Sequence, residues 1–454
     1  MDFRIEHDSM GEVEVDSARL WGAQTERSRR NFKIGEEKMP REIIRAFAVL
    51  KSACAEANCE LGRLSGVERD AIARVCYEIS LGALDAEFPL SVWQTGSGTQ
   101  TNMNLNEVIA NRGNALLGKK TLHPNDTVNM SQSSNDTFPS AMRIAAVCAI
   151  NERLVPAAER LIEAFLELEK KNADVIKVGR THLQDAVPLT LAQEISGWRS
   201  ALETSLSMVK ESRNYLYSLA LGGTAVGTGL NAPEGFDSAA VGHIAKATGY
   251  PFTPADNKFR ALTSLSDMAF SHGALRALAC DLMKIANDIR LLSSGPRCGI
   301  GELLIPENEP GSSIMPGKVN PTQCEMVTMV AARVMGNDTT VSVAASQGNF
   351  QLNVYLPVTA YTFLQSVTLL ADAMGSFTDN CVVGIKPNKK KISENLERSL
   401  MLVTALSGSI GYENAARVAK CAHAEDITLA EAAEKLGLLS KMEAEKLLDP
   451  QKMV

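Results

Sequence analysis

Residues 275–292, LRALACDLMKIANDIRLL, place apolar side chains at steps of three and four along the chain. The apolar positions are Leu275, Leu278, Leu282, Ile285, Ile289 and Leu292. Such a stripe is typical of a helix that buries one face in a core. The same spacing recurs from Phe363 to Phe377 and from Ile43 to Cys54. The pattern therefore predicts a mainly α protein.

Several of the predicted helices are long. Between Pro188 and residue 220 the chain contains one glycine, Gly197, and no second proline. That composition predicts a helix of about thirty residues, well above the ~11–12 residues of an average globular helix. Residues 139–171 and 322–347 have the same helical character, and runs of alternating polar and apolar residues are scarce. We therefore expect a bundle of unusually long helices.

Changes in composition divide the chain into three parts. Residues 1–131 form shorter segments interrupted by Gly and Pro, residues 132–386 hold the long helices, and residues 387–454 carry shorter helical patterns. We expect an N-terminal domain, a central bundle domain and a small C-terminal helical domain with these boundaries. The length of 454 residues agrees with this division, because roughly 150 residues form one domain.

The charge balance and the cysteines exclude some classes of protein. The chain has 46 Lys and Arg against 53 Asp and Glu, a formal net charge of −7, and no basic tract. This argues against nucleic acid or an anionic membrane as a partner. The nine cysteines are scattered, and no apolar run approaches the ~20 residues of a membrane helix. The start of the chain, residues 1–7, resembles no targeting segment, so we expect a cytoplasmic protein.

Four polar loops are candidates for chemistry. They are rich in Ser, Thr, Asn and Gly and span residues 94–107, 131–139, 179–188 and 310–321. The last three end in a proline, which we expect in the first turn of the following helix, where a missing N–H costs nothing. The N-terminus of a helix exposes backbone donors and the positive end of its dipole, so it suits a carboxylate or a phosphate.

Each loop taken alone fits a simple helix cap, because Ser, Thr and Asn cap most helices. Asn320 followed by Gln323, for example, resembles a capping box. Three such loops ahead of three long helices, one with Lys318 and one with His182, together favour a site for a negatively charged ligand.

Other kinds of site lack their signatures. The Gly-rich residues 222–229 do not match the phosphate-loop pattern and fit a turn with close backbone approach. The six histidines form neither an H-E-x-x-H motif nor a cluster with zinc spacing. His272 falls in an apolar helical pattern, which fits a structural role, and His123 fits a turn or a small anion pocket. We therefore expect side chains alone to carry the chemistry, with no metal and no organic cofactor.

The loop from Gly311 to Pro321 resembles the G-S-S-x-M-P-x-K-x-N-P signature of the fumarase/aspartase superfamily. Residues 3–454 as a whole resemble class II fumarases, with further matching motifs at residues 96–99, 123–126, 133–135 and 179–182. The resemblance implies a three-domain, mainly α fold with a central bundle of long helices. It also implies the reversible hydration of fumarate to L-malate by general acid/base catalysis through an aci-carboxylate intermediate.

Two alternatives stay open. Aspartate ammonia-lyase shares the fold, but His182 stands where aspartases usually carry Gln, and Gly317 where they usually carry Ala. Gln351 and Leu356, in contrast, stand where fumarases more often have Glu and a basic residue. A non-enzymatic helical protein is the second alternative, since some superfamily relatives are lens proteins. The presence of Ser312, with His182 and a nearby lysine, argues against it.

The resemblance also implies roles for individual residues. Ser312 matches the base that takes the proton from the substrate carbon. His182, with Glu325 behind it, matches the group that acts on the water molecule. Lys318 would stabilise the developing negative charge. The expected substrate-binding residues are Ser97, Gly98, Thr99, Ser133, Ser134, Asn135, Thr181, Ser313, Lys318, Val319 and Asn320. A secondary anion site would comprise His123, Pro124, Asn125 and Asp126. The expected assembly is a homotetramer whose active sites are shared between subunits.

Overall fold

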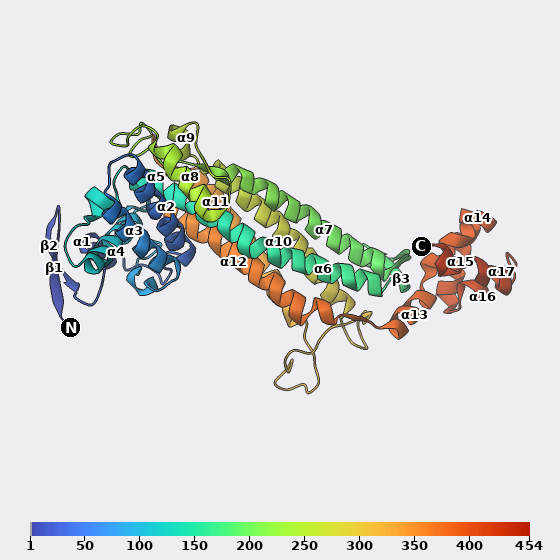
Figure 1. The fold of residues 1–454 in the computed structure, drawn as a ribbon. Helices are drawn as coiled ribbons and strands as arrows, with labels where there is room; N and C mark the ends of the chain where they lie inside the picture. Colours follow the sequence, from blue (N-terminus) through green and yellow to red (C-terminus); the bar gives the residue numbers. More distant parts are fainter. Residues whose placement is uncertain (1) are drawn as a thin grey trace. The chain divides into compact units, whose positions relative to one another are not determined.

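The computed structural model describes residues 2–454 and is mainly α-helical, which confirms the predicted fold class (Figure 1). Its strands form four separate two-stranded sheets within the described residues. The chain forms two compact units. One contains the residues up to Pro156 together with 206–279 and 332–371, and the other contains 157–205, 280–331 and 372–454. The domain boundaries at residues 131 and 386 remain a prediction.

Five long helices have residues in both units. They are α6 (Val155–Lys171), α7 (Leu191–Ser212), α10 (Ser266–Leu292), α11 (Thr322–Ala345) and α12 (Leu356–Asn380). Figure 1 shows α6, α7, α10 and α12 as extended ribbons. The stripe that predicted α10 is buried, since none of its six apolar residues is more than 5% exposed. The long predicted helix at 275–292 is therefore confirmed, and α11 confirms the helix predicted at 322–347, although it ends at Ala345.

The first unit begins with a β-hairpin of β1 (Phe3–Asp8) and β2 (Gly11–Asp16). Its helices are α1 (Ala23–Asn31), α2 (Arg41–Glu60), α3 (Gly66–Ser80), α4 (Thr99–Leu117), α5 (Ser134–Ala149), α8 (Phe236–Thr248) and α9 (Lys258–Thr263). A π-helical turn, η3 (Ile150–Leu154), joins α5 directly to α6. The predicted helical span at 139–171 is thus continuous but contains one wider turn. The short strands β5 (Ser218–Leu219) and β6 (Thr253–Pro254) pair in parallel.

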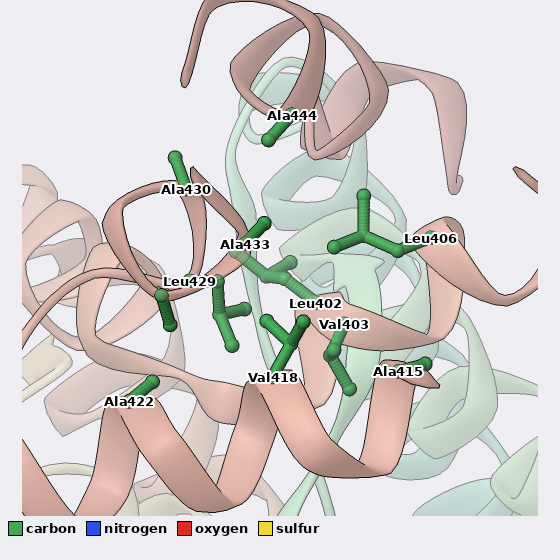
Figure 2. Close-up of a cluster of buried hydrophobic side chains, with 11 residues drawn as sticks. Leu402, Val403, Leu406, Ala415, Val418, Ala422, Leu429, Ala430, Ala433 and Ala444 are labelled. Carbon is green, nitrogen blue, oxygen red and sulfur yellow. The ribbon is translucent and has the colours of Figure 1, made fainter. Parts of the chain in front are cut away.

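The second unit contains an antiparallel hairpin of β3 (Ile176–Thr181) and β4 (Gln184–Thr190). The pair β7 (Leu303–Leu304) and β8 (Lys386–Pro387) is also antiparallel. The C-terminal helices are α13 (Lys389–Arg398), α14 (Ser407–Ile410), α15 (Tyr412–Glu425), α16 (Leu429–Lys435) and α17 (Lys441–Leu447). Side chains from Leu402 to Ala444, many of them alanines, form a small buried apolar cluster among these helices (Figure 2).

The long helix predicted between Pro188 and residue 220 is present, but its predicted start and its length of about thirty residues were wrong, since α7 has 22 residues. Pro188 lies in strand β4 opposite Val178, and α7 begins only at Leu191. The physical reason is that the residue before a proline is pushed toward extended backbone, and a proline is tolerated where its missing N–H is not needed by the ladder. Helical composition alone did not separate a short strand from the long helix that follows it.

The cysteines on the helices differ in their exposure. Cys54 and Cys76 are buried like small apolar side chains, whereas Cys280 is exposed although its helix has an apolar stripe. Cys280 lies off the buried stripe of α10, which explains the difference. Within residues 2–454, no helix combines the length and the apolar character needed to cross a bilayer.

Candidate active site

Two of the expected substrate-binding hydroxyls lie where α4 begins, Ser97 in the preceding loop and Thr99 as the first residue of the helix. The hydroxyl oxygen of Thr99 lies 2.8 Å from that of Ser97 and 2.7 Å from that of Ser134. Gly98 caps α4 in the left-handed region with a φ of 71°, and a Cβ there would lie 2.0 Å from the ring of Phe138. Only glycine fits this position, so the turn brings the three hydroxyls together at the start of α4 and α5.

The start of α5 is a capping box. The Ser133 hydroxyl accepts from the N–H of Asn135, and the Asp136 carboxylate accepts from the N–H of Ser133 at 2.9 Å. The amide of Asn135 donates to the carbonyl oxygen of Ala225 at 2.8 Å. Pro139 lies inside α5 rather than in its first turn, because this box starts the helix five residues earlier than the proline.

A buried lysine supports the turn ahead of Ser133. Lys51 on α2 is 1% exposed and donates to the side-chain oxygens of Asn129 at 3.1 Å and Gln132 at 2.8 Å. Burial lowers the pKa of Lys51 to about 8. Asn58, also on α2, donates to the carbonyl oxygen of Met130 at 3.0 Å. The turn is therefore held by polar contacts from a helix that the sequence indicated only as apolar.

Asp136 links α5 to the Gly-rich stretch. Its carboxylate accepts from the backbone N–H groups of Gly222 at 3.0 Å and Thr224 at 2.9 Å. Burial raises the pKa of Asp136 to about 6, and the N–H bonds from Ser133, Thr224 and Gly222 offset part of that rise. A Cβ at Gly222 would lie 2.4 Å from the Cβ of Asp237, so the expected close backbone approach in residues 222–229 is present.

In the second unit, His182 lies at the tip of the β3–β4 hairpin. His182 and Leu183 form the two-residue loop between the paired residues Thr181 and Gln184, and both have left-handed backbone, with φ of 56° and 59°. Such a turn normally takes Asn or Gly, and a left-handed non-glycine residue costs roughly 1–2 kcal/mol. Strain of this kind persists where the surrounding structure holds it, and it is frequent at functional sites.

The loop from Gly311 to Asn320 is a closed turn with an exposed face. The Ser312 hydroxyl accepts from the N–H groups of Ile314 at 3.3 Å and Met315 at 3.1 Å. The amide of Asn320 donates to the carbonyl oxygen of Gly311. A Cβ at Gly311 would lie 2.0 Å from the carbonyl oxygen of Lys318, so glycine lets the two ends of the loop meet. Other expected residues of this loop are Ser313, which is exposed, and Val319, which is half-buried.

The predicted capping box of Asn320 and Gln323 was wrong. The helix α11 begins at Thr322, the Asn320 amide binds Gly311, and the Gln323 side chain accepts from Ser376 at 2.9 Å. Closing the loop thus uses the side chain that would have capped the helix. Pro321 directly precedes α11 rather than lying within its first turn.

Glu325 lies in the first turn of α11 and is exposed. Among residues 2–454, neither a hydrogen bond nor an ion pair joins its side chain to His182. The structure of a single chain therefore brings Ser97, Thr99 and Ser134 together, and it does not pair the two residues expected on the water side.

His123 caps a short π-helical turn, η2 (Pro124–Val128). Its Nδ1 accepts from the N–H groups of Asn125 at 3.3 Å and Asp126 at 3.2 Å, and it lies 3.1 Å from the Asp126 carboxylate. His123, Asn125 and Asp126 are exposed. This geometry fits the turn that the sequence suggested, and the secondary anion site remains a prediction.

Residues that support the site were missed by the sequence analysis. Lys51 gave a signal, because it interrupts the apolar stripe from Ile43 to Cys54 on its buried side. Glu302, which binds the hairpin of His182, gave none, since it stands in a loop without helical spacing.

Comparisons with known proteins agree with the motifs. A lyase family model matches residues 11–336, and a model of the fumarase C C-terminus matches residues 402–454. The chain is 59% identical over 458 residues to fumarate hydratase class II of Bacillus subtilis, covering 100% of this chain and 99% of the relative. The corresponding protein of Helicobacter pylori is 58% identical over 459 residues, with 100% and 99% covered. The crystal structure of class II fumarase from Schistosoma mansoni has a TM-score of 0.97 at 42% identity, covering 100% of this chain and 99% of that one.

Proposed function

Since this chain belongs to the class II fumarate hydratase family, we propose that it interconverts fumarate and L-malate by general acid/base catalysis through an aci-carboxylate intermediate. The geometric observation that supports this best is the cluster of Ser97, Thr99 and Ser134 hydroxyls at the N-terminal ends of α4 and α5. Hydroxyls and helix N-termini bind carboxylates, and both fumarate and malate carry two.

The chemical difficulty lies in the C–H bond of malate. Its proton is very weakly acidic, because removing it places a second negative charge on a carboxylate that is already charged. A site must therefore hold both carboxylates, stabilise the dianion with preorganised donors, and supply a base and an acid.

The loop from Gly311 to Asn320 supplies the carbon side of this chemistry. Ser312 takes the C3 proton of malate, and its hydroxyl must be activated by nearby donors because serine is a poor base at its free pKa. Lys318 and Asn320 stabilise the aci-carboxylate. The backbone N–H bonds that Ser312 already receives from Ile314 and Met315 are of the kind that would stabilise its ionised form.

The β3–β4 hairpin supplies the group that acts on the hydroxyl of malate and on water. His182 protonates the departing hydroxyl of malate and, in the reverse direction, activates water, with Glu325 as its partner. The substrate is oriented by Ser97, Gly98, Thr99, Ser133, Ser134, Asn135, Thr181, Ser313 and Val319. His123, Pro124, Asn125 and Asp126 form a second anion site.

The active site is shared between copies of the chain in a homotetramer. This follows from the family, and two observations support it. No hydrogen bond or ion pair joins His182 to Glu325 within the described residues of one chain. Apolar side chains are also exposed on the long helices, among them Phe270 on α10, at 55%, and Met329 and Val343 on α11, at 67% and 54%. Burying such side chains against a partner helix stabilises an assembly by about 25 cal/mol per Å² of apolar surface. We further propose that the enzyme acts in the cytoplasm, in the tricarboxylic acid cycle.

The test is a direct assay. Purified protein is mixed with L-malate and then with L-aspartate, before and after chelator treatment, and the absorbance of the fumarate double bond is followed. Dehydration of malate that survives the chelator supports the proposal. Faster ammonia release from aspartate than water release from malate would instead assign the chain to the aspartate ammonia-lyases, which also carry Gln at the position of Gln351. Inactivity toward both would favour a structural role.

A further inference from the structure

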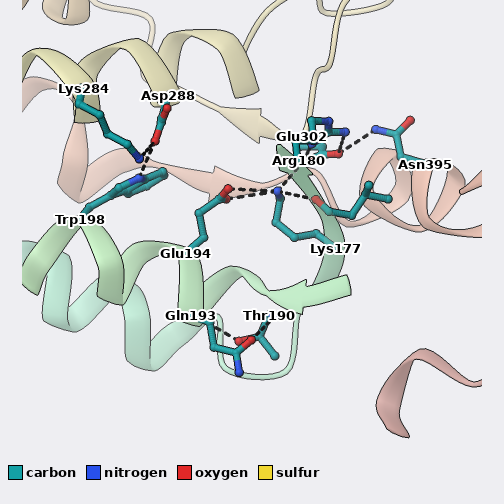
Figure 3. A network of polar contacts seen from close by, with 11 residues as sticks. Lys177, Arg180, Thr190, Gln193, Glu194, Trp198, Lys284, Asp288, Glu302 and Asn395 are labelled. Atoms are coloured by element: carbon teal, nitrogen blue, oxygen red, sulfur yellow. Dashed lines mark hydrogen bonds and ion pairs between the residues drawn. The ribbon is translucent and has the colours of Figure 1, made fainter. Parts of the chain in front are cut away.

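A fully buried carboxylate lies at the base of the hairpin that carries His182. Glu302 is 0% exposed and binds two cations of strand β3 (Figure 3). Its oxygens accept two bonds from the Arg180 guanidinium, at 2.6 and 3.0 Å, and one lies 3.2 Å from the Lys177 ammonium. Burial alone raises the pKa of Glu302, but the bonds from Arg180 and the charge of Lys177 outweigh it, so the pKa lies below its usual value. The carboxylate is therefore charged when the enzyme works.

The strand is irregular where it meets Glu302. Side chains alternate between the two faces of a regular strand, so Lys177 and Arg180, three residues apart, would point to opposite sides. The pairing register shifts between Val178 and Arg180, and the residue between them is Gly179. A Cβ at Gly179 would lie 2.5 Å from the carbonyl oxygen of Val187. This bulge lets both cations reach one carboxylate.

Glu302 itself is fixed from two sides. Its N–H donates to the carbonyl oxygen of Leu292 at the end of α10, at 2.8 Å, and its carbonyl oxygen accepts from the N–H of Asn388 at the start of α13, also at 2.8 Å. The amide of Asn395 on α13 donates to the carboxylate at 3.0 Å. The hairpin base is thus anchored to an acceptor that is itself hydrogen-bonded to α10 and α13.

The hairpin tip has no comparable support of its own. Within one chain His182 is exposed and Leu183 is 73% exposed, so packing of the chain's own side chains does not hold the left-handed loop. Arg180 is two residues from His182 and is the last anchored side chain before the tip. The anchor at the hairpin base is therefore the nearest described side-chain contact that can fix the orientation of the imidazole.

We propose that Glu302 is a positioning residue of the reaction, which fixes His182 for the water step through Arg180 and the bulge at Gly179. This rests on the proposed function, in which His182 acts on the water side and Ser312 on the carbon side. A misplaced His182 should slow loss of the hydroxyl while Ser312 still removes the C3 proton.

The test compares two rates in the parent and in Glu302→Gln: net dehydration of malate, and exchange of the malate C3 proton with solvent. We expect kcat for dehydration to fall about 10- to 100-fold with little change in KM. Proton exchange should fall far less, so that the ratio of exchange to dehydration rises. A purely structural role would reduce the active fraction and lower both rates by the same factor, which would overturn the proposal.

Two further variants make the result decisive. Glu169→Gln is the matched control, because Glu169 also binds an arginine, Arg199 at 2.9 Å, in the same unit, and it should leave the ratio unchanged. If Glu302→Gln does not fold, Asn395→Ala removes one hydrogen bond that an uncharged donor makes to Glu302, and it should raise the ratio by a smaller factor. An unchanged ratio in Asn395→Ala would then refute the proposal. A parent chain that does not dehydrate malate would refute the proposed function instead.

Discussion

The ammonium group of Lys51 lies 3.1 Å from the side-chain oxygen of Asn129, and the same oxygen accepts from the amides of Asn102 and Asn106, each also at 3.1 Å. One oxygen atom is thus held by a cation from α2 and by two amides from α4. Asn129 begins the turn that leads to Ser133, so the proposed substrate-binding loop rests on a buried polar base.

Replacing Lys51 with Met should weaken substrate binding more than it slows the chemistry. The change leaves the oxygens of Asn129 and Gln132 without their cationic donor, which costs about 1–3 kcal/mol of folding stability. The loosened turn should raise KM for fumarate roughly three- to tenfold, with a smaller drop in kcat. Steady-state kinetics measure both. Lys246→Met on the exposed side of α8 is the control, and an unchanged KM in Lys51→Met would contradict the role given to the turn.

The same lysine should make stability depend on alkaline pH. Its pKa is about 8 in the folded chain against an ordinary 10.5, so the folded state binds fewer protons than the unfolded state between these values. Stability therefore rises with pH across this window, and the contribution is lost as the pH falls through 8. The difference in unfolding free energy between parent and Lys51→Met should grow by about 1–3 kcal/mol from pH ~7 to pH ~10.

Nearby groups do not obscure this measurement. Asp136, with a pKa of about 6, is ionised throughout the window. Burial raises the pKa of the Cys76 thiol to about 12 and also raises that of Cys54, so both thiols make stability fall as the pH rises above 9. Parent and variant both carry these thiols, so their effect cancels in the difference. Thermal or denaturant unfolding of both proteins at several pH values gives the difference. A difference that stays constant or shrinks with rising pH would mean that Lys51 is not held with a lowered pKa.

The long helices could be predicted because their signal is repeated many times. The stripe from Leu275 to Leu292 marks one buried face over five turns, and the structure buries every member of it. The hairpin at residues 176–190 could not be predicted in the same way. Its strands have six and seven residues, and its bulge at Gly179 breaks the alternation that would have indicated a strand. Composition then assigned Pro188 to the following helix.

In the candidate site, too, some residues could be predicted from the sequence and others could not. Loops such as 310–321 could be predicted because their Ser, Gly and Pro content is unusual. The residues that support these loops and the hairpin could not be predicted. A buried ion such as Glu302 is recognised only when its partners are seen in space, and these lie 122 residues away at Arg180 and 93 residues away at Asn395. Sequence spacing carries no information about contacts at such separations.

The strained tip of the β3–β4 hairpin predicts variants in which stability and activity change in different ways. Leu183→Gly removes the steric cost of the left-handed residue but frees the backbone next to His182. Leu183→Asn also tolerates this backbone and stays stiffer. Both should keep or slightly raise the melting temperature, by an amount equivalent to about 1 kcal/mol at most. We expect kcat to fall several-fold in Leu183→Gly and to stay near the parent value in Leu183→Asn. Loss of stability in both variants would mean that the tip is not strained.

Shared active sites predict complementation between inactive chains. Ser312→Ala and His182→Asn each remove one catalytic group, and each alone should be nearly inactive. When the two are unfolded together and refolded, mixed tetramers should contain some sites with both groups intact. Partial recovery of malate dehydration is then expected, and refolding each variant alone is the control. Full activity of a parent monomer in sedimentation would contradict the assembly.

The last prediction separates the roles of Ser312 and His182. If Ser312 takes the C3 proton, Ser312→Ala should lower kcat by several orders of magnitude while substrate binding stays similar, the pattern of an interaction made mainly in the transition state. His182→Asn should impair water activation and flatten the pH profile, yet still allow slow exchange of the malate C3 proton, because the base that forms the carbanion remains. Exchange is measured by deuterium incorporation into malate from heavy water. Exchange that persists in Ser312→Ala and vanishes in His182→Asn would reverse the two roles.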